Sequence, residues 1–477
     1  MSETLKQKTA RGLFWGALNN GAMQFIGLVF GIVLGRLLNP SDYGMIAMIT
    51  IFTITATALQ DSGFGTAIVN LDEPKDEDYN SVFWFNILTG LACYVILFFC
   101  APFIASYYHE PRLVALSRYV FLSIIFSALG VAQSAYLQKH LMVKQRAKAN
   151  VTSVLLSSCV GVVMAWKGFA YWSLATQTNV YILGNMLFYW HYSHWRPTLH
   201  IDFGPVKRMF RFSCKILGTT IIQQINNNIL NILLGRYYSS RDAGFYNQAY
   251  QWNSKVIYLM QGMLGGVTQP VLVDLRNNSG RELAALRKLM RFTAFLSFPL
   301  LLGFGLVAKE FIVLAITSKW LASARLLQIL SIGGAFLPLS TLLSSFIISQ
   351  GKSGTYLLST LGLCVVQITT LLLTFRWGVS TMVVLITLIN VVWAFVWFFL
   401  AHRLIAYSLW MFLKDIVPFA LAAAAVMVAT FFITKGITTL WLLLIVRILL
   451  AALLYFAVMK VARVKILDEC IAFILHR

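Results

Sequence analysis

The chain alternates long apolar runs with short polar connections. A helix that crosses a bilayer needs about 20 consecutive apolar residues, and fourteen such segments follow one another along the sequence. Their approximate limits are 12–35, 43–66, 80–106, 113–138, 149–166, 169–190, 212–235, 244–271, 290–307, 326–350, 354–375, 378–400, 416–434 and 438–459. The pattern predicts an all-α integral membrane protein with about 14 transmembrane helices.

The connections are too short to hold a further domain, since the longest lie near 191–211 and 272–289. Composition excludes a soluble protein, because 59% of the residues are hydrophobic, 12% are charged and the mean hydropathy is +0.75. The six cysteines form no CxxC pair. We therefore expect them to be buried apolar side chains, with no disulfide framework, metal site or cofactor.

The net charge of +21 indicates orientation in the membrane. Of the 38 Lys and Arg residues, 25 fall on the side of the N-terminus, 11 on the other side, and two, Lys255 and Arg447, inside spans. Because basic residues concentrate on the cytoplasmic side, both termini are expected in the cytoplasm. The excess charge then favours contact with anionic membrane lipid, not with nucleic acid. The acidic connection 72–78 is either a solvated loop or a docking site for a partner.

An internal repeat has an offset of 200 residues. Residues 32–44 and 232–244 are identical at six of thirteen positions without a gap. Six predicted spans separate the copies, so both halves should cross the membrane in the same sense, related by a pseudo-twofold axis along its normal. This arrangement predicts an N-terminal lobe over 1–203, a C-terminal lobe over 204–404, and two appended spans with a tail over 405–477.

The repeated motif has either a structural or a substrate-binding role. The Asp of each copy follows the end of one span and is placed to cap the next helix, and it can also pair with the Arg across the turn. Direct contact of the motif with substrate is the alternative. The residues concerned are Gly35, Arg36, Asp42, Gly44, Gly235, Arg236, Asp242 and Gly244.

Amide side chains gather in three predicted spans. Polar residues inside a membrane usually face a cavity or another helix, and on the span 212–235 they recur at the spacing of one helical face. We predict that they line a wet cavity and that their donors and acceptors suit a sugar. The residues are Asn19, Asn20 and Gln24 in the first span, Gln224, Asn227, Asn228 and Asn231 in the seventh, and Gln248 and Gln251 in the eighth.

Lys255 lies about eleven residues into the eighth predicted span, at the expected bilayer midplane. All 17 carboxylates fall at or outside the span ends, with Asp61 closest to the interior. A phosphate or pyrophosphate headgroup is then the natural counter-ion for Lys255. The alternative is a lysine neutralised by its surroundings or reaching toward water. Arg447 is expected to snorkel or to pair locally.

Three motifs resemble the polysaccharide-transporter branch of the multidrug/oligosaccharidyl-lipid/polysaccharide exporter superfamily. They are GLFWG at 12–16, LGRLLNPSDYG at 34–44 and LQDSGF at 59–64, and the colanic-acid exporter type of lipopolysaccharide flippase is the most similar. The resemblance implies two six-helix lobes that work by alternating access, with spans one, two, seven and eight lining the cavity. It also implies translocation of undecaprenyl-pyrophosphate-linked oligosaccharide across the bacterial inner membrane, for surface polysaccharide export.

Partners would be the lipid-linked oligosaccharide, membrane lipid, and the polysaccharide polymerase and glycosyltransferases of the same pathway. A cation-coupled multidrug exporter on the same fold is the main alternative, but it needs an acidic residue in a cavity-facing span, and none is predicted. A membrane enzyme such as a polymerase typically has a large outer loop, whereas the outer connections here are short.

Overall fold

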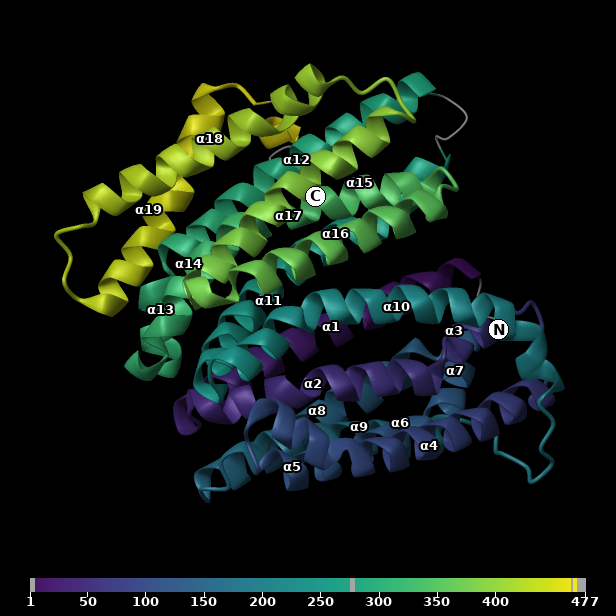
Figure 1. Cartoon of the computed structure of the whole chain (residues 1–477). Coiled ribbons are helices and arrows are strands. Elements are labelled where there is room, and N and C mark those ends of the chain that lie inside the picture. The colour runs from purple at the N-terminus through teal and green to yellow at the C-terminus, as the bar shows by residue number, and fades with distance from the viewer. Residues whose placement is uncertain (1–4, 275–278, 465, 470–477) are drawn as a thin grey trace. The chain divides into compact units, whose positions relative to one another are not determined.

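The computed structural model describes residues 5–274, 279–464 and 466–469. Side chains are described within these ranges except at 5–14, 17, 211, 212, 214–216, 263–274 and 279. Every regular element among the described residues is a helix. The chain forms two compact units, Met1–Gly244 and Phe245–Arg477, which are described separately. Figure 1 labels the helices of both.

The first unit contains ten helices among the described residues, and the first five residues of an eleventh. They are α1 (Leu5–Leu37), α2 (Pro40–Asp61), α3 (Phe64–Asn70), α4 (Asp76–Tyr108), α5 (Leu113–Val120), α6 (Leu122–Ala128), α7 (Val131–Lys139), α8 (Val143–Trp166), α9 (Tyr171–Tyr192), α10 (Gly204–Tyr237) and the start of α11 (Ser240–Asp274). The second helix of this series, α2, packs against both α4 and α10, as Figure 1 shows.

Two apolar clusters hold the first unit together. One joins α2 to α4, α5 and α6 through side chains such as Met48, Ile49 and Phe121, all at most 1% exposed. The other surrounds Phe64 of α3 and includes Phe83 of α4. Between them, the amide of Gln60 donates to Asn86 Oδ1 at 2.6 Å, and both residues are fully buried. Burial of polar groups is tolerated here because they bond to each other.

The connection after α9 is bound to the start of α4. Trp84 Nε1 donates to the carbonyl of Thr198 at 2.7 Å, and the Thr198 amide donates to Asn80 Oδ1 at 2.9 Å. Asp78, in the stretch predicted as an acidic loop, accepts from the Lys75 amide at 2.9 Å and pairs with Arg208 at 3.1 Å. The acidic residues thus lie at the start of a helix, where carboxylates are stabilising because the first backbone N–H groups have no partner within the helix.

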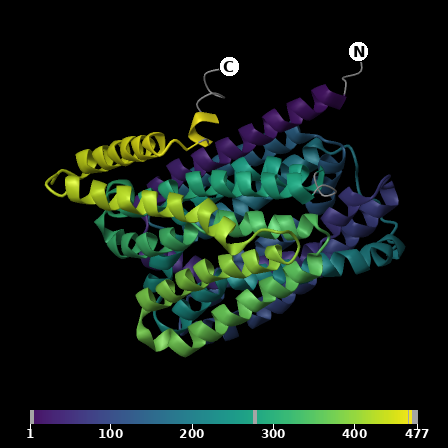
Figure 2. The same cartoon turned by 90° about the horizontal axis from the view of Figure 1, so that it is seen from above.

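The second unit contains the rest of α11 and eight further α-helices among the described residues. They are α12 (Ser279–Leu306), α13 (Ala308–Ile316), α14 (Leu321–Gly334), α15 (Leu337–Ser349), α16 (Ser353–Thr374), α17 (Val379–His402), α18 (Leu409–Ile433) and α19 (Leu440–Val461), with 3₁₀ turns at Ser318–Trp320 and Phe375–Trp377. The last two helices, α18 and α19, lie side by side (Figures 1 and 2) and pack onto α12.

The predicted membrane fold is confirmed. Within the described residues, ten helices are long and apolar enough to cross a membrane, or eleven if the bent pair Leu113–Ala128 and Val131–Lys139 forms one span. The three other predicted spans correspond to α9, α10 and α11, which are helices of 22, 34 and 35 residues outside that set. The exact count of fourteen stays a prediction.

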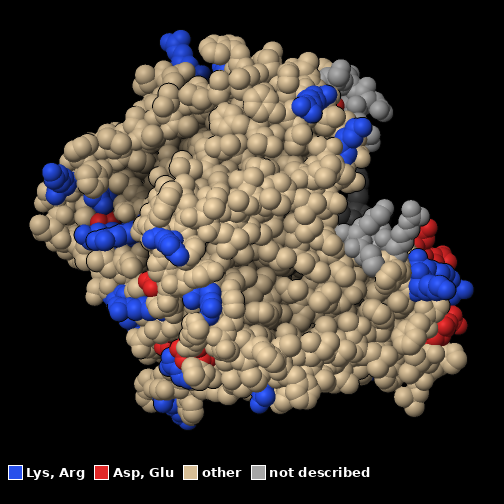
Figure 3. All heavy atoms as spheres, viewed as in Figure 1, with Lys and Arg blue, Asp and Glu red and all other residues tan. Residues whose placement is uncertain are grey.

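Much of the surface is apolar. Most atoms visible in Figure 3 belong to uncharged residues. Large side chains along the lengths of helices are exposed, such as Phe103 of α4 at 76% and Leu453 of α19 at 66%. Patches of this kind are costly in water and ordinary in lipid.

The compact units differ from the predicted lobes. Because α10 packs against α2, α3 and α4, the first unit extends beyond the predicted boundary at residue 203. The segment 405–477, predicted as an appendage, packs within the second unit through α18 and α19. The lobes of the transport cycle stay a prediction.

Candidate functional site

The amide stripe of α10 is partly exposed and partly buried. Asn227 is exposed and Gln224 is half-buried, whereas Asn228 and Asn231 are 9% and 3% exposed. The Asn228 amide donates to the backbone carbonyl of Gln224 at 2.9 Å. The buried Asn231 Oδ1 accepts no hydrogen bond from a described residue. The stripe therefore offers an exposed edge, and at least one of its buried amides bonds along its own helix.

The amides of α1 lie about four to five turns into the helix, which begins at Leu5. Asn20 is exposed, and Asn19 and Gln24 are half-buried. The Asn19 amide approaches Asn20 Oδ1 at 3.5 Å, the long limit for a hydrogen bond. These side chains therefore keep most of their hydrogen-bonding capacity for other groups.

On α11, the predicted residues belong to the second unit. Gln248 is 3% exposed, Gln251 is exposed and Lys255 is half-buried. Lys255 Nζ lies 4.7 Å from the centroid of the Trp252 ring. Such a contact attracts an ammonium to the ring electrons. One further amide, Asn253, donates to the Leu330 carbonyl at 3.3 Å and so ties α11 to α14.

The predicted polar residues are thus divided between the units. Those of α1 and α10 lie in the first, and those of α11 lie in the second. The prediction that all three helices line one cavity stays a prediction.

The Asp of each repeated motif lies in the first turn of a helix. At α2, Asp42 Oδ2 accepts from the Asn39 amide at 2.8 Å, one half of a capping box. At α11, the Ser239 hydroxyl donates to Asp242 Oδ2 at 2.6 Å and accepts from the Asp242 amide at 3.1 Å. The two copies therefore start their helices in related ways.

The Arg of the second copy does not form the predicted pair with Asp242 among the described ion pairs. Arg236 instead donates to the Tyr107 carbonyl, lies 2.6 Å from His109 Nε2 and covers the Tyr107 ring at 4.9 Å. It joins the end of α10 to the end of α4. Arg36, in the first copy, is exposed.

The glycines of the two copies meet. A Cβ added at Gly44 would lie 1.6 Å from the Ser240 carbonyl oxygen, and one added at Gly244 would lie 1.8 Å from that of Pro40. Gly235 is close to α2, because its Cβ would lie 2.7 Å from Met48 Cγ. These approaches are possible only without side chains at the glycines. Gly35 is buried.

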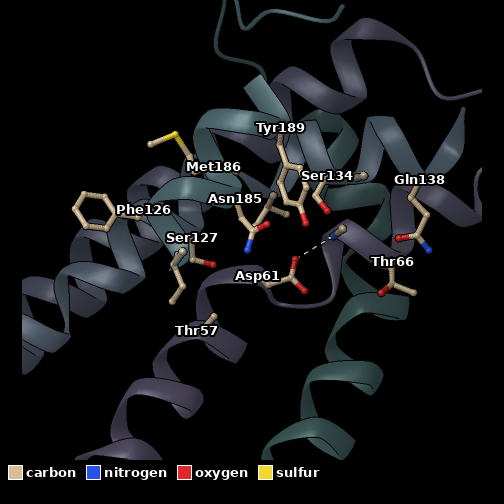
Figure 4. Close-up of a pocket in the computed structure, with 15 residues that line it drawn as sticks. Thr57, Asp61, Thr66, Phe126, Ser127, Ser134, Gln138, Asn185, Met186 and Tyr189 are labelled. Atoms are coloured by element: carbon tan, nitrogen blue, oxygen red, sulfur yellow. Dashed lines mark hydrogen bonds between the residues drawn. The ribbon is translucent and has the colours of Figure 1, made fainter. Parts of the chain in front are cut away.

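The interpretation that every carboxylate lies at or outside a span end needs correction. Asp61 lies within the candidate span Pro40–Asn70, and Asp415, which is 1% exposed, lies within Leu409–Ile433. Ser62 and Gly63 follow Asp61 with φ of 47° and 74° and interrupt the helix (Figure 4). In the sequence, this Ser-Gly pair is the signal for the break. A carboxylate beside a break in a span is a typical feature of functional sites in membranes.

Arg447 does not snorkel. It is 6% exposed, and its Nη1 lies 3.0 Å from Glu310 Oε1, while its Nε donates to Thr434 Oγ1 at 3.1 Å. This buried pair fastens α19 to α13. A structural role accounts for Arg447, and a role of Lys255 in binding substrate stays a prediction.

Known families and relatives give an independent comparison. Residues 33–325 match the family described as "Polysaccharide biosynthesis protein". The "Teichuronic acid biosynthesis protein TuaB" of Bacillus subtilis (strain 168) is 25% identical over 384 residues, 78% of this chain and 80% of the relative. The "Lipopolysaccharide biosynthesis protein WzxC" of Escherichia coli (strain K12) is 24% identical over 355 residues, 73% of this chain and 71% of the relative.

A solved structure gives the fold comparison. The structure of "Lipid II flippase MurJ, inward closed conformation" matches with a TM-score of 0.74 at 14% identity, over 97% of this chain and all of that chain. At that identity the likeness concerns the fold alone. It agrees with the all-helical membrane architecture described above.

Proposed function

This chain belongs to the polysaccharide biosynthesis protein family, and on that premise we propose that it is a flippase for lipid-linked oligosaccharide. The substrate is an oligosaccharide repeat unit carried on undecaprenyl pyrophosphate, which the protein moves across the bacterial inner membrane by alternating access. The observation that carries the proposal is the family match over residues 33–325, in a chain with the fold of a lipid flippase. The protein is a transporter and not an enzyme.

The relatives favour this function over the multidrug alternative. Two proteins that match about three quarters of this chain are named for teichuronic acid and for lipopolysaccharide biosynthesis. A drug exporter would not be expected in such pathways. The family premise therefore points to a glycan precursor as cargo.

Lys255 is the proposed ligand of the pyrophosphate. Lys255 Nζ lies 4.7 Å from the centroid of the Trp252 ring, and an ammonium forms charge-assisted hydrogen bonds with phosphate oxygens. The exposed amides Asn20, Asn227 and Gln251 are the proposed partners of sugar hydroxyls, since each amide offers donors and an acceptor. The other predicted amides of these helices belong to the same proposal: Asn19 and Gln24 in α1, Gln224, Asn228 and Asn231 in α10, and Gln248 in α11.

The membrane setting belongs to the same proposal. The excess of Lys and Arg on one side of the predicted spans orients both termini toward the cytoplasm. The substrate would then be loaded at the cytoplasmic leaflet and released to the outer one. The polymerase and the glycosyltransferases of the pathway are the expected partners.

A deletion strain tests the function. Loss of the protein should cause lipid-linked oligosaccharide to accumulate in the inner leaflet and surface glycan to disappear, with no change in drug resistance. Altered drug resistance with normal glycan export would contradict the proposal.

Variants of Lys255 test the assigned ligand. At equal protein amount, Lys255→Ala should reduce export about tenfold or more, since bonds to a charged group contribute about 1.5–3 kcal/mol. Lys255→Arg should retain part of the activity. Lys352→Ala, at an exposed position before α16, is the matched control. Export by Lys255→Ala at the wild-type rate would refute its role and leave the proposed function standing.

A further inference from the structure

A pocket lies at one end of the second unit, where the starts of α12 and α18 meet the end of α19. Its volume is about 280 Å³. Helix α18 packs against both of the others and lies beside α19 in Figures 1 and 2. Two cations line the pocket, Arg291 from α12 and Lys414 from α18. The other lining side chains are apolar, such as Phe419 of α18, Met459 of α19 and Ile466 after it.

The carboxylate next to Lys414 already has its partners. Asp415, which is 1% exposed, accepts hydrogen bonds from Arg287 at 2.8 and 3.0 Å, and the Tyr407 hydroxyl donates to it at 3.1 Å. Arg291 Nε lies farther away, 3.6 Å from Asp415 Oδ1, and donates to the Arg287 carbonyl at 3.3 Å. A separation of 3.6 Å is too long for a hydrogen bond. One negative charge therefore faces two guanidinium groups.

Two further carboxylates lie just after the pocket residues in the sequence, and both are paired. Asp468 Oδ1 lies 3.1 Å from Lys460 Nζ, and Glu469 Oε2 lies 2.7 Å from Lys288 Nζ. The ion pairs among the described residues do not include Lys414, which is exposed. The pocket therefore keeps an excess of positive charge, which an anion would balance.

The apolar walls select the class of anion. Phe419 and Met459 are 5% and 2% exposed, and α18 and α19 are both candidate membrane spans. A free phosphate ion would meet the two cations but would leave these walls in contact with water. The phosphate ester of a lipid also supplies carbon atoms that cover them. Since a water occupies about 30 Å³ in the liquid, the pocket has room for a phosphate group and the first carbons of a chain.

The lining also separates a phospholipid from a lipid that carries sugars. Among the described residues that line the pocket, no side chain carries an amide or a hydroxyl, so a glycan would leave its own hydroxyls unpaired there. A guanidinium bonds phosphate oxygens in pairs, and an ammonium adds a compact charge.

The predicted orientation places this end of the helices at the cytoplasmic leaflet, where basic pockets between transmembrane helices bind anionic headgroups. We propose that the pocket holds the phosphate of an anionic phospholipid of the surrounding membrane, between Arg291 and Lys414, with its chain against α19. This ligand is distinct from the cargo and does not involve Lys255.

Native mass spectrometry of the full-length protein in detergent tests the site. The wild type should retain added phosphatidylglycerol in preference to phosphatidylcholine. Lys414→Gln and Arg291→Gln should each weaken the binding of phosphatidylglycerol about fivefold, since one basic residue near an anionic lipid contributes about 1 kcal/mol. Because Lys414 is exposed, its variant should fold even if that of Arg291 does not. Equal retention of the two lipids by the wild type would overturn the proposal.

Two control variants separate the pocket from general attraction to anionic lipid. Lys352→Gln removes an exposed cation on the same predicted side of the membrane and should bind phosphatidylglycerol like the wild type. Ala422→Phe fills the pocket without a change of charge and should weaken binding. The same loss in Lys352→Gln as in Lys414→Gln, or unchanged binding in Ala422→Phe, would show that surface charge alone holds the lipid.

Two competitors identify the source of the phosphate. Neither inorganic phosphate in excess nor an undecaprenyl-pyrophosphate-linked oligosaccharide at equal concentration should displace phosphatidylglycerol. Displacement by the first would mean that the pocket binds the free ion, and displacement by the second would assign the pocket to the cargo. Either result would overturn the proposal. None of these outcomes bears on glycan export by the deletion strain.

Discussion

Replacing Gly244 by alanine should force two helix ends apart. The new Cβ would lie 1.8 Å from the Pro40 carbonyl oxygen and 2.6 Å from its carbon. Ordinary contact begins at about 3.4 Å, so the start of α11 must move by about 1.6 Å from the start of α2. The obstacle is backbone, which cannot rotate away as a side chain does.

The expected cost follows from two opposing terms. Overpacking costs about 1–3 kcal/mol in well-packed proteins, and a clash with backbone places this case at the upper end. Alanine in place of glycine within a helix returns up to about 1 kcal/mol. The net loss should be about 2 kcal/mol or more. It should appear as a lower thermal midpoint, or as a shorter half-life at a fixed temperature where unfolding is irreversible.

The matched control and the double variant make this prediction refutable. Gly21→Ala in α1 meets no atom within 4 Å, so it should be neutral or slightly stabilising. Gly44→Ala should cost about as much as Gly244→Ala. Because one separation of the helices admits both methyl groups, the double variant should cost clearly less than the sum. A Gly244→Ala protein as stable as Gly21→Ala, or strict additivity, would show that the close approach is wrong.

Three charge pairs give further predictions, each measured by thermal unfolding. Glu310→Gln leaves the buried Arg447 without a counter-charge and should destabilise by about 3–5 kcal/mol, much of which a second change of Arg447→Met should restore. Asp415→Asn weakens the bidentate contact with Arg287, at 2.8 and 3.0 Å, and should also lower the midpoint because the carboxylate is buried. Arg208→Ala removes a pair whose arginine is 74% exposed and should change stability by less than about 1 kcal/mol.

Features that depend on residues close together in the sequence could be predicted from the sequence alone. The apolar runs indicate the spans, since the thickness of the bilayer sets their length at about 20 residues. In each copy, the Asp carboxylate bonds to the residue three positions earlier, which directly precedes the helix. The spacing along the sequence is therefore enough to identify this Asp as part of the helix cap. The break after Asp61 is likewise readable from the Ser-Gly pair, although the predicted span 43–66 ran through it.

Features that join distant segments could not be read in this way. Arg447 reaches Glu310 across 137 positions, and Arg287 reaches Asp415 across 128. Nothing in the local pattern distinguishes Arg447, which has a buried carboxylate partner, from Lys255, whose ammonium lies over a ring. The cavity that Asp61 and Asn185 both line (Figure 4) could not be predicted from the sequence for the same reason, since the two residues come from different helices, α2 and α9.

The repeat connects these two kinds of information. In the sequence, an offset of 200 relates Gly44 to Gly244 without indicating why glycine is needed at either position. In the structure, each glycine faces the carbonyl four residues before the other, Ser240 for Gly44 and Pro40 for Gly244. Such reciprocity is what a twofold relation between the two copies requires. The glycines are therefore explained by contact with each other's segments, and a change at either one must be felt by both copies.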